Sequence, residues 1–211
     1  MNNRQIVLAR SVWLFDLNEI NPLGVALGPV HTALRERYQF LQYPSRPEDF
    51  AKTEITYQQG EFSGIGVNLF MYSDGLIADT RTSTETSDAF LNDLLTWAQD
   101  TFKFRYEQQL IKKKAYDSQV VFNSDVTILK ALGRLEEFAK TLENLEPDRA
   151  TSPQDVVAIA FRNEKDTARP SFTFERRDNT PFSENKYFSR AALSTKEHLH
   201  LIEEFEQLMK S

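Results

Sequence analysis

The sequence predicts an α+β protein of two similar halves, in which helices cover one face of an antiparallel sheet. Three observations support this class. The chain has 211 residues, of which 40% are hydrophobic and 12% aromatic, enough to bury a substantial core. Short alternating segments indicate strands, and longer segments with helical spacing indicate helices. The order strand, helix, strands and helix occurs in residues 1–110 and again in residues 111–211, which we expect to form one compact domain.

The first half opens with a strand and a short helix. Residues 6–17 alternate between two apolar sets, as expected of a strand that is buried on both faces. Behind Pro29, a favourable residue in the first turn of a helix, apolar residues recur at helical spacing as far as Phe40. The dipeptides that end in Pro44 and Pro47 then indicate a loop, because the residue before a proline avoids helical angles.

A hairpin and a long helix complete the first half. Residues 67–72 form an alternating strand, and Asp74 with Gly75 supplies the positive-φ pair of a tight hairpin. Thr86 or Ser87 can cap the helix that follows, whose apolar residues share one face. That face consists of Leu91, Leu94, Leu95, Ala98 and Phe102.

The second half repeats this order after Lys112, Lys113 and Lys114, which we interpret as a linker or exposed turn. A helix is expected from Ile128 to Leu145, and Ser194 and Glu197 form the capping box of the closing helix. Strands are expected at residues 119–122, 156–161, 171–176 and 186–191.

The two closing helices align at one constant offset. Thr86 pairs with Ser194 as a cap, and Leu91 pairs with Leu199 on the apolar face. The opening strands accept the same offset, which favours an internal duplication. Any two amphipathic helices can be aligned somewhere, however, so duplication and chance both remain open.

Residues 68–80, running into the helix of residues 87–97, resemble the strand, hairpin, strand and helix that end each repeat of the TATA-binding protein. This resemblance implies two pseudo-symmetric halves that share a curved antiparallel sheet. That family kinks DNA by inserting paired Phe residues into the minor groove from a basic, apolar sheet face. The corresponding strands here carry Glu54, Asn68, Asp79 and Glu175, so we transfer the architecture and none of the DNA contacts.

Composition excludes several classes of protein. The formal net charge of -6 argues against a general phosphate-backbone binder, which depends on clustered Lys and Arg. The absence of cysteine removes disulfides, thiolate nucleophiles and thiolate metal sites. The apolar run of residues 6–9 is shorter than a signal peptide core, and no stretch approaches the roughly 18 apolar residues of a membrane span. We therefore expect a cytoplasmic protein without membrane contact.

Motifs of catalysis and cofactor binding are weak. The carboxylates of Asp74, Asp79 and Asp88 lie around the hairpin and the next helix start, where they can form an acid/base or Mg²⁺ site. The structural alternative is a turn and a helix N-terminus. No dinucleotide loop, phosphate loop or nucleophile elbow occurs, so we expect no cofactor. His198 and His200 point apart on a helix, so we expect no metal.

A basic and aromatic segment offers a second kind of site. Aromatic residues alternate with cations there, which is typical of surfaces that combine base stacking with phosphate contacts. The residues are Arg169, Phe172, Phe174, Arg176, Arg177, Lys186, Tyr187 and Arg190. Glu164, Asp166, Glu175, Asp178 and Glu184 interleave with them, so a solvated, salt-bridged hairpin is the alternative.

The leading prediction is a non-enzymatic binding or adaptor protein, a protein-interaction subunit of an intracellular assembly. The helix of residues 128–145 has a long apolar stripe that can pack in the core, dock a partner helix or pair with a second copy of the chain. A protein partner or self-association is therefore expected. One alternative is a nucleic-acid-binding protein that uses the open sheet face and the hairpin from Arg169 to Arg190. The other is a small acid/base or metal-assisted enzyme.

Overall fold

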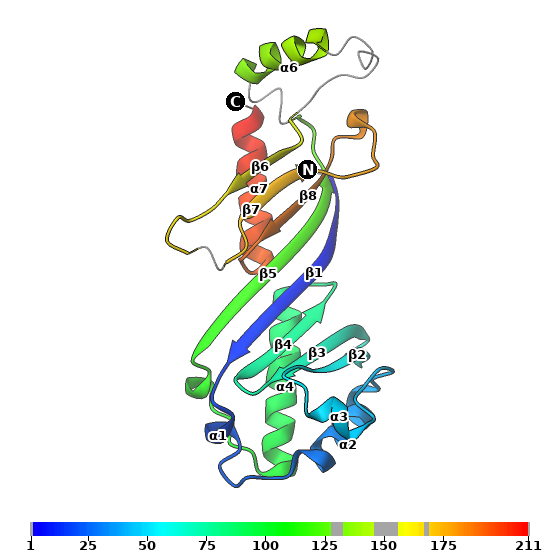
Figure 1. Cartoon of the computed structure of the whole chain (residues 1–211), viewed down its shortest axis with the longest axis vertical. Coiled ribbons are helices and arrows are strands. Elements are labelled where there is room, and N and C mark those ends of the chain that lie inside the picture. Colours follow the sequence, from blue (N-terminus) through cyan, green and yellow to red (C-terminus); the bar gives the residue numbers. More distant parts are fainter. Residues whose placement is uncertain (1, 128–132, 146–155, 167–168, 211) are drawn as a thin grey trace. The chain divides into compact units, whose positions relative to one another are not determined.

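The chain forms one eight-stranded antiparallel sheet with α-helices, as a computed structural model shows (Figure 1). The structure describes residues 2–127, 133–145, 156–166 and 169–210. Within these residues there are six α-helices, so the predicted α+β class is confirmed. The hydrogen-bonded order of the strands is β2-β3-β4-β1-β5-β8-β7-β6.

The chain divides into two compact units. The first, the 8–118 unit, consists of Leu8–Ser118 and Leu193–Thr195. The second, the 119–211 unit, consists of Met1–Val7, Gln119–Ala192 and Lys196–Ser211. Strands β1 (Asn2–Leu14) and β5 (Lys113–Asn123) therefore each contribute residues to both units.

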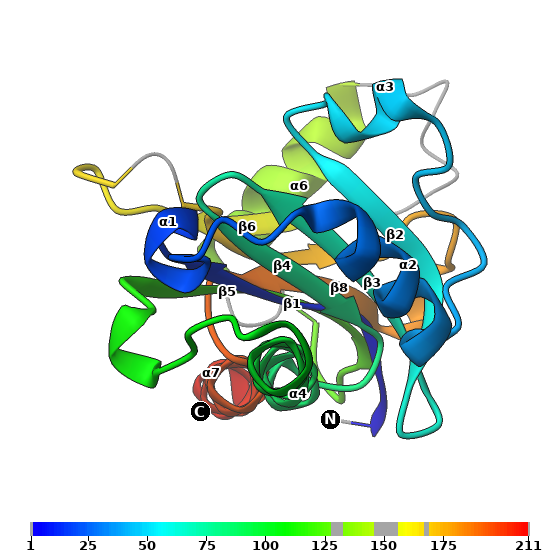
Figure 2. The ribbon, with the colours of Figure 1, turned by 90° about the horizontal axis from the view of Figure 1, so that it is seen from below.

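Among the described residues, the 8–118 unit contains eight elements besides its parts of β1 and β5. They are α1 (Leu17–Ile20), α2 (Leu27–Tyr38), α3 (Pro47–Phe50), β2 (Ile55–Phe62), β3 (Ile65–Tyr72), β4 (Gly75–Thr80), α4 (Thr84–Phe102) and a short 3-10 helix (Gln108–Leu110). Helix α4 packs against β4, and Figure 2 looks along its axis. The core between helices and sheet includes Trp13, Leu34, Tyr57, Phe90 and Leu91. The sheet alternates, so Leu76 and Ala78 face this core whereas Asp79 points to the other side.

In its described part, the 119–211 unit contains six elements besides its parts of β1 and β5, and its described core is smaller. They are α6 (Gly133–Leu145), β6 (Ala158–Phe161), β7 (Phe172–Arg176), a 3-10 helix (Phe182–Glu184), β8 (Lys186–Ala191) and α7 (Thr195–Lys210). Its core includes Val120, Phe122, Phe174, Tyr187 and Ile202. Phe174 lies 4.7 Å from Phe205 of α7 between ring centroids, so α7 covers the face that these residues share.

The predicted β3–β4 hairpin is present, but its turn differs from the prediction. Neither Asp74 nor Gly75 has a positive φ, and the turn residues are Ser73 and Asp74. Gly75 is required for another reason, because an added Cβ would lie 2.4 Å from the carbonyl oxygen of Trp13 on β1. The positive-φ pair occurs instead at Ser63 and Gly64, between β2 and β3.

Three predicted boundaries are corrected by the structure. The first strand ends at Leu14, because Asp16 caps α1 by accepting the N–H of Asn18. Helix α4 begins at Thr84, and its cap is Ser83 in place of the predicted Thr86 or Ser87. Lys113 and Lys114 are the first residues of β5, so they do not form the predicted linker or turn.

Other predictions agree with the structure or lie outside it. Strands β6, β7 and β8 lie within the predicted ranges, and α6 lies within the predicted helix from residue 128 to residue 145. The first five residues of that predicted helix, 128–132, and the predicted loop of residues 147–153 fall outside the described residues.

The N-terminus of α4 is fixed by a reciprocal pair of buried hydrogen bonds. The backbone N–H of Thr84 donates to Oγ1 of Thr195 at 3.0 Å, and the N–H of Thr195 donates to Oγ1 of Thr84 at 2.8 Å. Ser87, one turn further on, donates its hydroxyl to the carbonyl of Ala9 on β1 at 2.8 Å. The two threonine contacts satisfy N–H groups that a helix start leaves without a partner.

Candidate functional site

The three aspartates predicted for acid/base chemistry lie in separate environments. Asp74 is exposed in the β3–β4 turn. Asp79 accepts two hydrogen bonds from the Arg10 guanidinium, both at 2.7 Å, on the sheet face opposite α4. Asp88 lies on α4 and accepts hydrogen bonds from Trp13 Nε1 at 2.8 Å and from the Tyr116 hydroxyl at 2.9 Å. The structure does not bring these carboxylates into one pocket.

The Arg10–Asp79 pair is a structural ion pair of the sheet. Hydrogen bonding to Asp79 raises the pKa of Arg10, an effect that burial of the guanidinium opposes. The bidentate geometry uses both carboxylate oxygens, so Asp79 is held in place and screened by its partner. Arg10 and Asp79 are paired residues of β1 and β4, so their ion pair helps to fix the register of these two strands.

The predicted histidines also lie apart. His198 is completely buried, and its Nε2 lies 2.9 Å from the Ser189 hydroxyl. His200 is exposed and lies 3.5 Å from Glu204, one turn along the same helix. Among the described residues, no group of three or more His, Asp or Glu side chains could hold a metal ion.

The predicted basic and aromatic set is divided between the two faces of strands β7 and β8. Phe174 and Tyr187 are completely buried against α7, and Phe172 is half-buried on the same side. Arg176 is buried with them, and its Nη1 donates to the carbonyl of Phe182 at 3.1 Å. These aromatic rings therefore belong to the core and offer no stacking surface.

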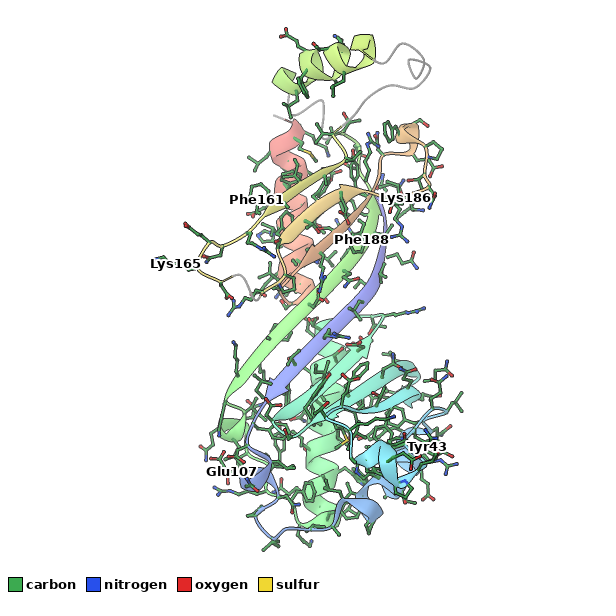
Figure 3. All side chains as sticks on the ribbon, viewed as in Figure 1. Tyr43, Glu107, Phe161, Lys165, Lys186 and Phe188 are labelled. Atoms are coloured by element: carbon green, nitrogen blue, oxygen red, sulfur yellow. The ribbon has the colours of Figure 1, made fainter. Side chains whose placement is uncertain are left out.

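The remaining members of that set lie on the other face or in a loop. Strand alternation places Lys186, Phe188 and Arg190 on the face opposite the core. Figure 3 labels Lys186 and Phe188. The guanidinium of Arg177 lies 6.0 Å from the Phe188 ring. Arg169 is exposed and forms an ion pair with Asp166 at 2.8 Å. Phe188 was missed by sequence analysis, although its place between Lys186 and Arg190 in an alternating strand was a usable signal.

Among the described helices, α6 has the largest group of exposed, large apolar side chains. Leu135 is 42% exposed, Phe138 59% and Leu142 38%. Their spacing of three and then four residues places them along one side of the helix, and we call them the α6 stripe. Ala139, next to Phe138, is buried. Apolar side chains that line up in this way and stay in contact with water are typical of an interaction surface.

Comparisons with protein families and curated proteins found no match. No known protein family matches the chain, and no curated protein shows significant similarity to it.

In the part of the chain that the structure describes, no helix combines the length and the apolar character needed to cross a bilayer.

Proposed function

We propose that the protein is a non-enzymatic adaptor, a protein-interaction subunit of an intracellular assembly, and that it pairs with a second copy of itself through the α6 stripe. The observation that carries the proposal is the exposure of Leu135, Phe138 and Leu142 along one side of α6. The predicted catalytic aspartates support it indirectly, because Asp79 and Asp88 are engaged in structural contacts.

The sequence of α6 suits pairing between identical helices. Leu135, Phe138 and Leu142 follow the alternating three- and four-residue spacing of a coiled-coil seam. In an antiparallel pair, Leu135 lies opposite Leu142 of the second copy, and the two Phe138 rings meet near the centre. The described neighbours that flank this seam, Ala139 and Thr141, are small and uncharged. Among the described residues, no charged side chain therefore lies directly beside the seam when two acidic copies approach along α6.

The proposal also includes an internal duplication, which would make the molecule a doubled scaffold. Thr84 and Thr195 begin α4 and α7 and are separated by 111 residues. The same separation matches buried positions along both helices. They are Thr84, Ser87, Leu91, Leu95 and Ala98 in α4, and Thr195, His198, Ile202, Glu206 and Met209 in α7. This alignment replaces the pairing of Thr86 with Ser194, because α4 starts earlier than predicted.

The preceding strands support the same separation. At this separation, buried residues of β4 match buried residues of β8. The matched positions are Leu76 and Tyr187, Ala78 and Ser189, and Thr80 and Ala191. The likeness to the order of elements in the TATA-binding protein stays a prediction about architecture. The buried positions of Phe174 and Tyr187 favour a protein partner over nucleic acid, because stacking on bases requires exposed rings.

Sedimentation equilibrium over a range of concentrations tests the pairing. We expect a monomer–dimer equilibrium, and we expect Phe138→Ser to weaken the dimer at least tenfold, or about 1.4 kcal/mol. Lys140→Ser is the matched control, because Lys140 is exposed on the opposite side of α6. A chain that stays monomeric at every concentration, or a dimer that both substitutions leave equally strong, would overturn the proposal.

A further inference from the structure

The 8–118 unit contains a cavity that the proposed pairing does not use. Its volume is about 370 Å³, within the range typical of small-molecule sites. Side chains of α1, α2 and α4 and of the neighbouring strands form its walls. Its inner end is lined by Leu34, Leu76, Leu94 and Ala98, all of which are buried and apolar. Protein interiors rarely leave a space of this size, because close packing normally fills it.

The cavity is polar only at its mouth. Lys52 and Thr53, between α3 and β2, and Ser73, in the β3–β4 turn, line it and are exposed to solvent. Phe50 of α3 stands beside them, 38% exposed, with its ring 4.7 Å from that of His31. The mouth therefore lies between the α3–β2 connection and the β3–β4 turn, and the inner end offers no polar partner among its apolar side chains.

Lys52 gives the mouth a positive charge. Of the described residues that line the cavity, Lys52 is the only charged one. Its ammonium group lies 2.8 Å from Asp49, which is not part of the lining. Asp49 also accepts the N–H of Arg46 and forms an ion pair with its guanidinium at 3.6 Å. Asp49 thus keeps a cationic partner if Lys52, which has three N–H donors, turns toward a ligand.

We propose that this cavity binds a small amphipathic carboxylate, with its apolar body inside and its carboxylate at Lys52. Moving the apolar body from water into an apolar cavity is favourable. The carboxylate stays at the mouth, because a charged group at the inner end would be buried without a hydrogen-bond partner. The cation at the mouth selects an anionic head group over a cationic one, and the cavity volume limits the ligand to a short chain or a single ring system.

Isothermal titration calorimetry with octanoate tests this proposal on the full chain. We expect saturable binding of octanoate and weaker binding of the neutral alcohol 1-octanol. Lys52→Gln is expected to weaken octanoate binding by about fivefold and to leave 1-octanol binding unchanged, as the loss of one exposed ion pair predicts. Lys165→Gln is the matched control, because Lys165 is an exposed lysine of the 119–211 unit (Figure 3).

Two further variants separate the cavity from other apolar surfaces. Ala98→Leu adds volume at the inner end and is expected to weaken both ligands, provided that its circular dichroism spectrum matches the wild type. Phe138→Ser alters the α6 stripe and is expected to change neither affinity. Absence of octanoate binding, binding that Lys52→Gln leaves unchanged, or binding that Phe138→Ser abolishes would each overturn the proposal.

Discussion

The proposed duplication matches helices α4 and α7, and their buried side chains differ in chemistry. At two matched positions α4 has Ser87 and Leu95, whereas α7 has His198 and Glu206, and all four side chains are buried. Glu206 accepts hydrogen bonds from the Ser124 hydroxyl at 2.8 Å and from the Asp125 N–H at 3.1 Å. At the position that Leu95 occupies in α4, the 8–118 unit therefore has apolar packing, whereas the 119–211 unit has a hydrogen-bonded carboxylate beside a smaller described core.

The largest effect is expected from truncating the matched apolar residues. Leu91→Ala and Ile202→Ala each remove a completely buried side chain and are expected to lower the free energy of unfolding by about 2–5 kcal/mol. Urea denaturation can be followed by circular dichroism for the whole chain. Fluorescence reports on the 8–118 unit, because both tryptophans, Trp13 and Trp97, lie there.

The two probes also show whether the units unfold together. Strands β1 and β5 contribute residues to both units, so we expect the fluorescence and circular dichroism midpoints to shift equally in each variant. If Ile202→Ala lowers the circular dichroism midpoint and leaves fluorescence unchanged, the units unfold independently.

A smaller effect is expected from making α7 resemble α4. Glu206→Leu introduces the residue that α4 has at the matched position, Leu95. It removes the acceptor of Ser124 and Asp125, so we expect a loss of about 1–3 kcal/mol in spite of the added apolar surface. Glu206→Gln keeps one acceptor oxygen and is expected to lose less in the same urea titration. A Leu variant as stable as the wild type would show that packing alone holds both helices.

The smallest effect concerns a buried imidazole of the 8–118 unit. Burial lowers the pKa of His31, whose Nδ1 is hydrogen-bonded to the Tyr57 hydroxyl. The unfolded chain therefore takes up a proton at a pH where the folded protein does not. The contribution of the neutral His31 to stability is fully present above the unfolded pKa of 6.5, and it is lost as the pH falls below that value.

Unfolding free energies at several pH values check this expectation. We expect the wild type to lose stability between pH 8 and pH 5.5, because the unfolded chain takes up this proton before the folded protein does. His31→Gln cannot titrate, so its loss over the same interval should be smaller. Equal losses in both proteins would mean that His31 is protonated as readily in the folded state as in the unfolded chain.

Much of the fold could be predicted because strand and helix periodicity are local properties. The apolar spacing from Leu91 to Ala98 is sufficient to predict α4 and its buried face. The start of α4 was missed, since residues 82–87 contain several possible caps. The choice of Ser83 depends on the burial of Ser87 against Ala9, a contact between distant residues. The need for glycine at position 75 also depends on a distant residue, because an added Cβ would clash with Trp13 on another strand.

The candidate sites could be predicted only in part, because exposure depends on what covers each face. The apolar spacing on α6 was visible in the sequence, but whether Phe138 is buried or exposed was not. The alternation from Lys186 to Arg190 was also visible. The side of β8 that α7 covers decides that Tyr187 is core and Phe188 is not. The cavity near Lys52 has no local pattern, since its walls come from many segments.

The reciprocal hydrogen bonds between Thr84 and Thr195 have a consequence for synthesis on the ribosome. The two residues are separated by 111 positions, so α4 is translated long before the hydroxyl that its first N–H needs. Until then, this N–H must stay hydrated, because a buried N–H without a partner is costly. Final closure of the 8–118 unit therefore waits for the nascent chain to reach Thr195, and translational pausing before that codon would prolong an open, protease-sensitive intermediate.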